Sequence, residues 1–134
     1  MGKLTATVLA AAAIAVTFTG TAQAETNPRC STGVTKIGDT KYLKSGSKTV
    51  ASVKQFKGCN KNWGYIYVWD SWKADHPNFV ATVAVTTGDG GIDTDSGARG
   101  QQEVWSRGAR TLNVCTQVYG TVSGGHAGFT EERC

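Results

Sequence analysis

The chain has 134 residues, with 14 Lys and Arg against 10 Asp and Glu, a formal net charge of +4, and four cysteines. This length fits one domain after removal of a leader and excludes a second domain of ordinary size. A charge of this size does not favour nucleic acid as a partner.

The N-terminus has the pattern of a secretory signal peptide over residues 1–24. A positive charge at Lys3 precedes an apolar stretch over residues 4–18, and the small residues Ala22 and Ala24 form an A-x-A cleavage pattern. The stretch is about 15 residues long, shorter than the ~20 that a membrane-spanning helix needs. We therefore expect removal of residues 1–24 and secretion of a single domain, residues 25–134, with no membrane span.

All four cysteines lie in the expected mature domain. In an oxidising compartment an even number of cysteines predicts disulfides, here two, and three pairings are open. The pairing Cys30–Cys59 with Cys115–Cys134 is favoured because it closes the shortest loops. No two cysteines have the C-x₂₋₄-C spacing of a zinc site, so neither a metal nor another cofactor is expected.

In chain order, the first elements of the domain are predicted strands. Residues 35–43 form a weak strand, 45–47 a turn, and 49–56 a strand rich in β-forming residues. Residues 57–62 then make a hairpin-like connection with Cys59 at its apex.

The strongest predicted strand covers residues 63–72. Alternation separates its side chains onto two faces. One face carries Trp63, Tyr65, Tyr67 and Trp69, and the other carries Ile66, Val68 and Trp72. Because both faces are apolar or amphipathic, we expect a central strand.

The next segments continue the β pattern. After a break at residues 73–78, a strand is predicted over 79–87, with Phe79, Ala81, Val83 and Val85 on one side. Residues 88–91 are rich in glycine and predict a turn. Residues 93–100 are expected to form a loop or a bulged edge.

Two further strands are predicted over residues 101–105 and 110–119, followed by a glycine-rich stretch over 120–128. Helical periodicity is weak throughout the domain, so helix should be scarce. The sequence therefore predicts an all-β fold, a small antiparallel sandwich or barrel of about six or seven short strands braced by two disulfides and preceded by a cleaved signal-peptide helix.

Two segments have some features of a chemical site. The acidic segment 89–97 resembles a calcium loop, but from Asp93 the sixth position is Ala98 and the twelfth is Val104, so a solvated hairpin loop is the favoured interpretation. His126 lies in a glycine-rich loop near Glu131, yet no motif fixes a catalytic geometry around it. No catalytic residue is predicted, and we expect no enzyme.

Aromatic residues are the candidate contact residues. Trp63, Tyr65, Tyr67 and Trp69, joined by Trp105, are expected to form a platform for a protein partner or for sugar rings. The alternative is that these rings fill a core that has few Leu and Ile residues. Exposure of the strand face distinguishes the two.

Charged residues are unevenly distributed along the domain. Seven lysines fall between residues 36 and 61 against one acid, Asp39, whereas most of the charged residues in the segment 70–103 are acidic. Such segregation can form a basic face for an anionic polymer, but solvated strand edges are the favoured interpretation.

The cysteine layout resembles that of a known group. The segments Thr94-Asp-Ser-Gly97 and Cys115-Thr-Gln-Val-Tyr-Gly-Thr-Val-Ser-Gly-Gly125, with the terminal Cys134, resemble the spore-associated protein A group of actinobacterial secreted proteins. The segment 49–53 leading to Cys59-Asn-Lys-Asn-Trp63 is similar to another small secreted domain of Gram-positive bacteria. Either resemblance implies an extracellular four-cysteine β protein and supplies no catalytic residues.

These observations predict a secreted, non-enzymatic binding protein at the cell or spore surface, or a small subunit of a secreted assembly. Its expected partner is another secreted or surface protein or a cell-wall polymer. Two alternatives remain: an inhibitor of an extracellular hydrolase, using an exposed loop at residues 88–97 or 120–128, and a small secreted hydrolase, which requires a histidine and a carboxylate in one cleft.

Overall fold

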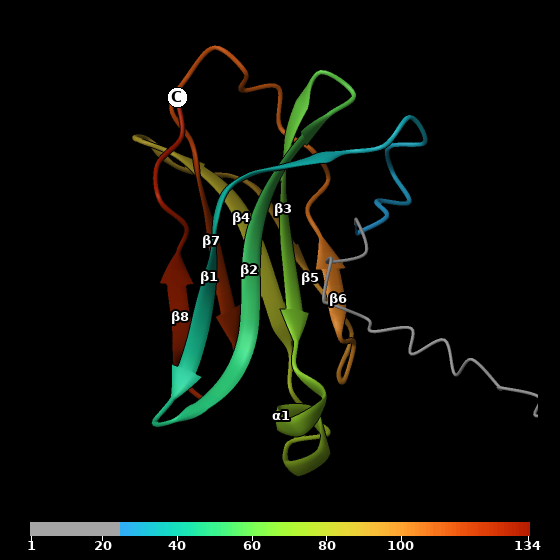
Figure 1. Cartoon of the computed structure of the whole chain (residues 1–134), viewed down its shortest axis with the longest axis vertical. Helices are drawn as coiled ribbons and strands as arrows, with labels where there is room; N and C mark the ends of the chain where they lie inside the picture. The colour runs from blue at the N-terminus through green and yellow to red at the C-terminus, as the bar shows by residue number, and fades with distance from the viewer. Residues whose placement is uncertain (1–24) are drawn as a thin grey trace, which may run out of the picture.

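Two antiparallel four-stranded sheets pack face to face in the computed structural model, which describes residues 25–134 (Figure 1). The first sheet has the order β1 (Thr35–Ser45), β2 (Lys48–Gly58), β3 (Lys61–Val68), β6 (Glu103–Trp105). The second has the order β5 (Gly90–Ser96), β4 (Ala81–Thr87), β7 (Gln117–Val122), β8 (His126–Phe129). The predicted all-β antiparallel fold is confirmed as a sandwich, and the predicted signal peptide lies outside the described residues.

The described chain has eight strands rather than six or seven. The predicted turn at 88–91 and loop or bulged edge at 93–100 contain a full edge strand, β5, and the glycine-rich stretch 120–128 contains the end of β7 and most of β8. Their glycines and aspartates lower intrinsic β propensity. Pairing with β4 and β7 overrides that preference, with a register shift at Val85/Thr86 marking a bulge.

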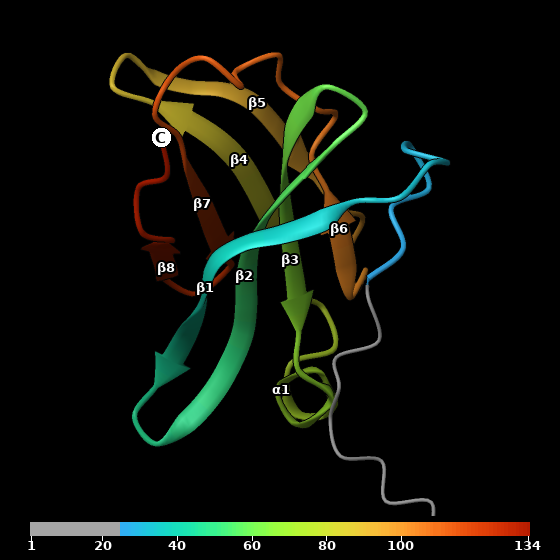
Figure 2. The same ribbon diagram turned by 45° about the horizontal axis from the view of Figure 1, so that its top comes forward.

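The predicted strand over residues 63–72 ends earlier than expected, at Val68. A short helix, α1 (Asp70–Asp75), follows, and lies at one end of the sandwich in Figures 1 and 2. The Trp69 carbonyl accepts the backbone N–H groups of Trp72 and Lys73, which closes the first helical turn. This turn places Trp72 in the core with 8% exposure, a position that an extended strand does not provide.

The predicted strand over residues 110–119 is also displaced, since β7 begins only at Gln117. Upstream of it, Asn62 donates its side-chain amide to the Thr111 hydroxyl at 2.9 Å. Asn62 also bridges to Ala109 through the backbone, so the chain there pairs with the start of β3 rather than with the second sheet.

A hairpin turn with Cys59 at its tip joins β2 to β3 as predicted, but the turn has two residues, because part of the connection predicted over residues 57–62 is paired strand. Gly58 pairs with Lys61, and both residues between them have positive φ, 52° at Cys59 and 57° at Asn60. This is the backbone pattern of a type I′ hairpin turn, which matches the twist of the flanking strands.

Both disulfides have the favoured pairing, Cys30–Cys59 and Cys115–Cys134. The first attaches the irregular N-terminal segment to the β2–β3 turn. The second joins the start of the β7 region to the C-terminal residue. Each therefore fixes a segment that has little regular structure of its own.

The main core lies between the sheets and is made largely of valine. As predicted, Phe79, Ala81, Val83 and Val85 share one side, and all four are buried there. A Cβ atom at Gly120 would lie 2.4 Å from Val53 Cγ2 of the opposite sheet. The two sheets therefore approach too closely at this point for any larger residue.

Candidate functional site

The outer face of the first sheet carries the aromatic residues singled out in the sequence, and half of that face is buried. Trp63 and Tyr65 are 1% and 2% exposed, and they cluster with Phe56, Trp105 and Cys30. The Tyr65 ring centroid lies 4.6 Å from that of Trp105. Trp63, Tyr65 and Trp105 thus form a second small core.

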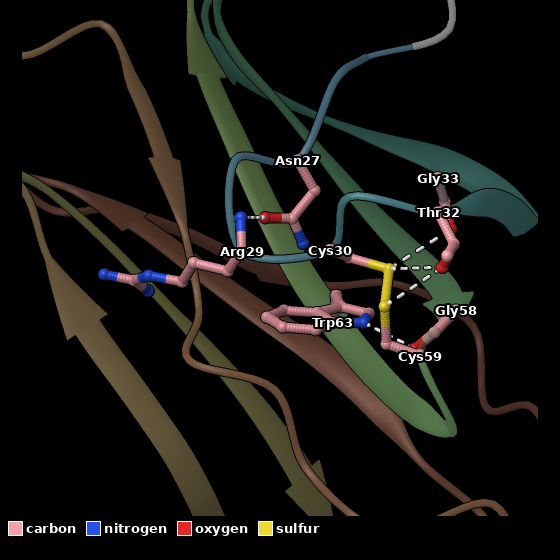
Figure 3. Close-up of a disulfide and its surroundings, with 8 residues drawn as sticks. All are labelled: Asn27, Arg29, Cys30, Thr32, Gly33, Gly58, Cys59 and Trp63. Atoms are coloured by element: carbon pink, nitrogen blue, oxygen red, sulfur yellow. Dashed lines mark hydrogen bonds between the residues drawn. A yellow bond between two sulfur atoms is a disulfide. The ribbon is translucent and has the colours of Figure 1, made fainter.

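The N-terminal segment covers this second core. The Cys30–Cys59 disulfide holds the segment beside Trp63, whose indole Nε1 donates to the Gly58 carbonyl at 2.9 Å (Figure 3). Arg29 points away from the disulfide in the same view and donates to the Trp105 carbonyl at 3.0 Å. These contacts seal the aromatic cluster at one end of the sheet face.

The other half of the face is open. Tyr42 of β1 is 47% exposed and Trp69, just after β3, is 38% exposed. Their ring centroids lie 6.2 Å apart in an edge-to-face arrangement. The Trp69 indole Nε1 donates to the Ser52 hydroxyl at 2.9 Å, which fixes the orientation of the ring.

A cleft of about 500 Å³ lies beside these two rings. Its walls combine aromatic, hydroxyl and charged side chains. The lining residues are Glu25, Lys36, Thr40, Tyr42, Ser52, Lys54, Tyr65, Tyr67 and Trp69. An ion pair between Lys54 and Glu25 forms part of this wall, and both side chains are only 15% exposed. We refer to this hollow as the aromatic cleft.

A hydrogen-bond network supports the cleft where β3 meets α1. The Tyr67 hydroxyl donates to Asp70 Oδ1 at 3.1 Å, and Gln102 Nε2 donates to the Tyr67 hydroxyl at 3.0 Å. The hydrogen bond from Gln102, and to a smaller extent the one from Tyr67, lowers the pKa of Asp70. Burial raises the pKa of Tyr67, and the hydrogen bond to Asp70 raises it further by a smaller amount. Asp70 is therefore the charged acceptor of this network and Tyr67 a neutral donor.

The five predicted contact residues thus separate into two groups. Tyr67 and Trp69 line the aromatic cleft, whereas Trp63 and Trp105 lie in the second core and Tyr65 reaches the cleft only from a buried position. Sequence reasoning missed Tyr42, because Gly38 and Asp39 interrupt the weak strand predicted over residues 35–43 and the register of β1 shifts between Ile37 and Lys41. The structure pairs Tyr42 with Ser52 on the adjacent strand, which places it on the same face.

The lysines between residues 36 and 61 do not all share one face. Lys36 and Lys54 line the aromatic cleft, while Lys57 lines a separate hollow together with Cys134. Lys41 Cε lies 3.0 Å from the position that a Cβ on Gly128 of β8 would occupy. These four lysines therefore do not all lie together and do not form one continuous basic surface.

The acidic segment 89–97 is not the solvated loop that the sequence favoured. Asp93 is 8% exposed, and its carboxylate accepts the backbone N–H groups of Arg107 and Gly108 at 2.9 and 2.8 Å. Asp95 pairs with Arg29 at 3.0 Å. Both carboxylates therefore contact neighbouring segments from the paired strand β5.

Both histidines pack on one tryptophan. The His76 ring stacks on Trp72 with centroids 3.8 Å apart, and the His126 ring meets Trp72 edge-on at 5.0 Å. Within residues 25–134, neither histidine forms an ion pair with a carboxylate. His76 Nδ1 also lies 3.2 Å from the Trp72 carbonyl oxygen, so both histidines contact Trp72.

Among the described residues, no helix is long and apolar enough to cross a membrane. Comparison with known proteins adds no relative: no protein-family model, no curated protein and no solved structure matches this chain.

Proposed function

We propose that the protein is a secreted, non-enzymatic binding protein that contacts its partner through the aromatic cleft. The partner is another secreted or surface protein or a cell-wall polymer, met at the cell or spore surface or within a secreted assembly. The observation that carries the proposal is the exposure of Tyr42 and Trp69 in a cleft that also has hydrogen-bonding walls.

Exposure of these two rings stands out because the same sheet face buries its other large rings. Trp63, Tyr65 and Trp105 are covered by the N-terminal segment, but Tyr42 and Trp69 are not. Large aromatic side chains that are held rigidly at a surface provide contact area at a low entropic cost. The bond from Trp69 to Ser52 supplies that rigidity.

Secretion is supported by the signal-peptide pattern of residues 1–24 and by the two disulfides. The resemblance of the cysteine layout to spore-associated protein A is the basis for proposing a cell or spore surface as the location.

The two alternative functions receive less support. An inhibitor needs a rigid exposed loop, but most of segment 88–97 is the paired strand β5, and in segment 120–128 only residues 123–125 lie outside β7 and β8. A hydrolase needs a histidine that is bonded to a carboxylate. Asp75 and His76 line one hollow of about 430 Å³, but the His76 ring stacks on Trp72 and its Nδ1 lies 3.2 Å from the Trp72 carbonyl oxygen. Within residues 25–134 no carboxylate is ion-paired with either histidine.

The test is an affinity capture from the culture of the producing organism, using the oxidised chain as bait. A Tyr42→Ala/Trp69→Ala variant is compared with a Leu112→Ala/Val114→Ala control, which removes similarly exposed apolar groups, 38% and 50% exposed, elsewhere. We expect one partner protein or wall fraction to be retained by the wild type and the control and lost by the cleft variant. Equal retention by all three, or no specific retention, contradicts the proposal.

A further inference from the structure

The outer face of the second sheet has an unusual composition, because its outward-facing strand positions carry no charged side chain. Val83, Val85, Val118 and Val122 point into the core and are fully buried. The alternate positions therefore face outward. The two acidic residues of β5, Asp93 and Asp95, pair with Val85 and Val83 and thus belong to the inward-facing register.

One cross-strand row of this outer face is made of small hydroxyl and methyl groups. Thr82 of β4 pairs with Ser96 on one side and with Thr121 on the other, and Thr121 pairs with Ala127. The hydroxyls of Thr82 and Ser96 lie 2.7 Å apart. Each hydroxyl has one donor and two acceptor positions, so this pair keeps hydrogen-bonding capacity for a ligand.

The adjacent row adds an aromatic pair. Ala84 pairs with Thr94 on one side and Tyr119 on the other, and Tyr119 pairs with Phe129. The rings of Tyr119 and Phe129 lie 4.8 Å apart at 44°, and Phe129 is 49% exposed. Ala84 is small, so the rings and threonines around it border a hollow of about 590 Å³.

Charge decides which ligand suits this face. A phosphate-bearing or acidic polymer needs cationic partners, and none occupies the outward positions of these strands. A purely apolar partner leaves the remaining donor and acceptor positions of the hydroxyl row without partners, which is costly once water is excluded. A ligand that presents both C–H faces and neutral hydroxyls satisfies the aromatic row and the hydroxyl row together.

We propose that the outer face of the second sheet is a binding site for a neutral polysaccharide. The Tyr119–Phe129 pair stacks against the C–H face of a sugar ring, and the Thr82 and Ser96 hydroxyls exchange hydrogen bonds with sugar hydroxyls. This site lies on the opposite outer face of the sandwich from the aromatic cleft, and its existence does not depend on the function proposed for that cleft.

The experiment measures depletion of the full chain, expressed through an oxidising secretory route, by two insoluble neutral polymers, cellulose and chitin. Carboxymethyl-cellulose serves as the anionic control. We expect binding to at least one neutral polymer that persists in 1 M salt, where ionic attraction is screened, and weaker binding to the anionic control. Phe129→Ala and Thr94→Lys each alter an exposed side chain and should weaken binding at least tenfold.

The Tyr42→Ala/Trp69→Ala variant should bind the neutral polymer like the wild type, which separates this site from the aromatic cleft. The proposal is overturned if neither neutral polymer removes the chain from solution. It is also overturned if the cleft variant is the one variant that loses binding. Sedimentation provides a further test. A dimer that Phe129→Ala dissociates assigns the face to a second copy of the chain and overturns the proposal as well.

Discussion

The division of the aromatic residues into a buried and an exposed group predicts that two tryptophans of the strand predicted over residues 63–72, Trp63 and Trp69, contribute unequally to stability. Trp63 is 1% exposed and donates to the Gly58 carbonyl. Truncation of a buried tryptophan to alanine costs about 3–5 kcal/mol. Trp69 is 38% exposed, so its truncation removes mainly the bond to Ser52 and the contact with Tyr42. Each of these is worth about 1 kcal/mol.

We therefore expect Trp63→Ala to lower the free energy of unfolding by about 4 kcal/mol and Trp69→Ala by about 2 kcal/mol. With a denaturant slope near 2 kcal/mol per M of urea, the two midpoints should differ by about 1 M. The assay is urea unfolding followed by far-ultraviolet circular dichroism with the disulfides intact, and Trp63→Phe provides a milder variant if Trp63→Ala does not fold. Equal midpoints, or a larger loss for Trp69→Ala, refute the assignment of Trp63 to the core and Trp69 to the cleft.

Three further predictions concern the scaffold. Replacing Cys30 and Cys59 with serine should lower unfolding stability by about 3.5 kcal/mol because the bridge closes a separation of 29 residues, and no change in the urea midpoint contradicts this. Burial, and to a smaller extent a hydrogen bond to the Glu103 carboxylate, raises the pKa of Tyr65 above its ordinary value of 10. The contribution of Tyr65 to unfolding stability should thus be constant below pH 10 and be lost above it. In urea titrations between pH 8 and 11, the Tyr65→Phe variant should therefore lose less stability than the wild type. An identical loss in both proteins argues against a buried phenol. Gly120→Ala places a Cβ 2.4 Å from Val53 Cγ2 and should lower stability by about 1–3 kcal/mol, whereas a neutral result in calorimetry means that the sheets are further apart.

Much of the fold was predicted from the alternation of apolar and polar residues. The alternation in residues 63–68 correctly indicated an inner strand with two occupied faces, and β3 does lie between β2 and β6. The prediction failed at Trp69, where the aromatic pattern continues but the chain turns into α1. A tryptophan fits a strand or a short helix equally well, so local pattern does not locate that boundary.

The candidate site was less predictable because its limits depend on distant contacts. Trp105 and Trp69 look alike in the sequence, yet only Trp105 is covered by the N-terminal segment. That coverage depends on Arg29, which reaches the Trp105 carbonyl across 76 residues of sequence, and on the Cys30–Cys59 bridge. Exposure of an aromatic residue is thus a property of the assembled sandwich.

The most direct test of the central claim is hydroxyl-radical footprinting of the oxidised chain, with and without the secreted and cell-wall fractions of the producing organism. A partner bound in the aromatic cleft should lower oxidation of Tyr42 and Trp69 and leave the similarly exposed Leu112 and Val114 unchanged. Unchanged oxidation of Tyr42 and Trp69, while other residues become protected, would contradict the account and place the contact surface elsewhere.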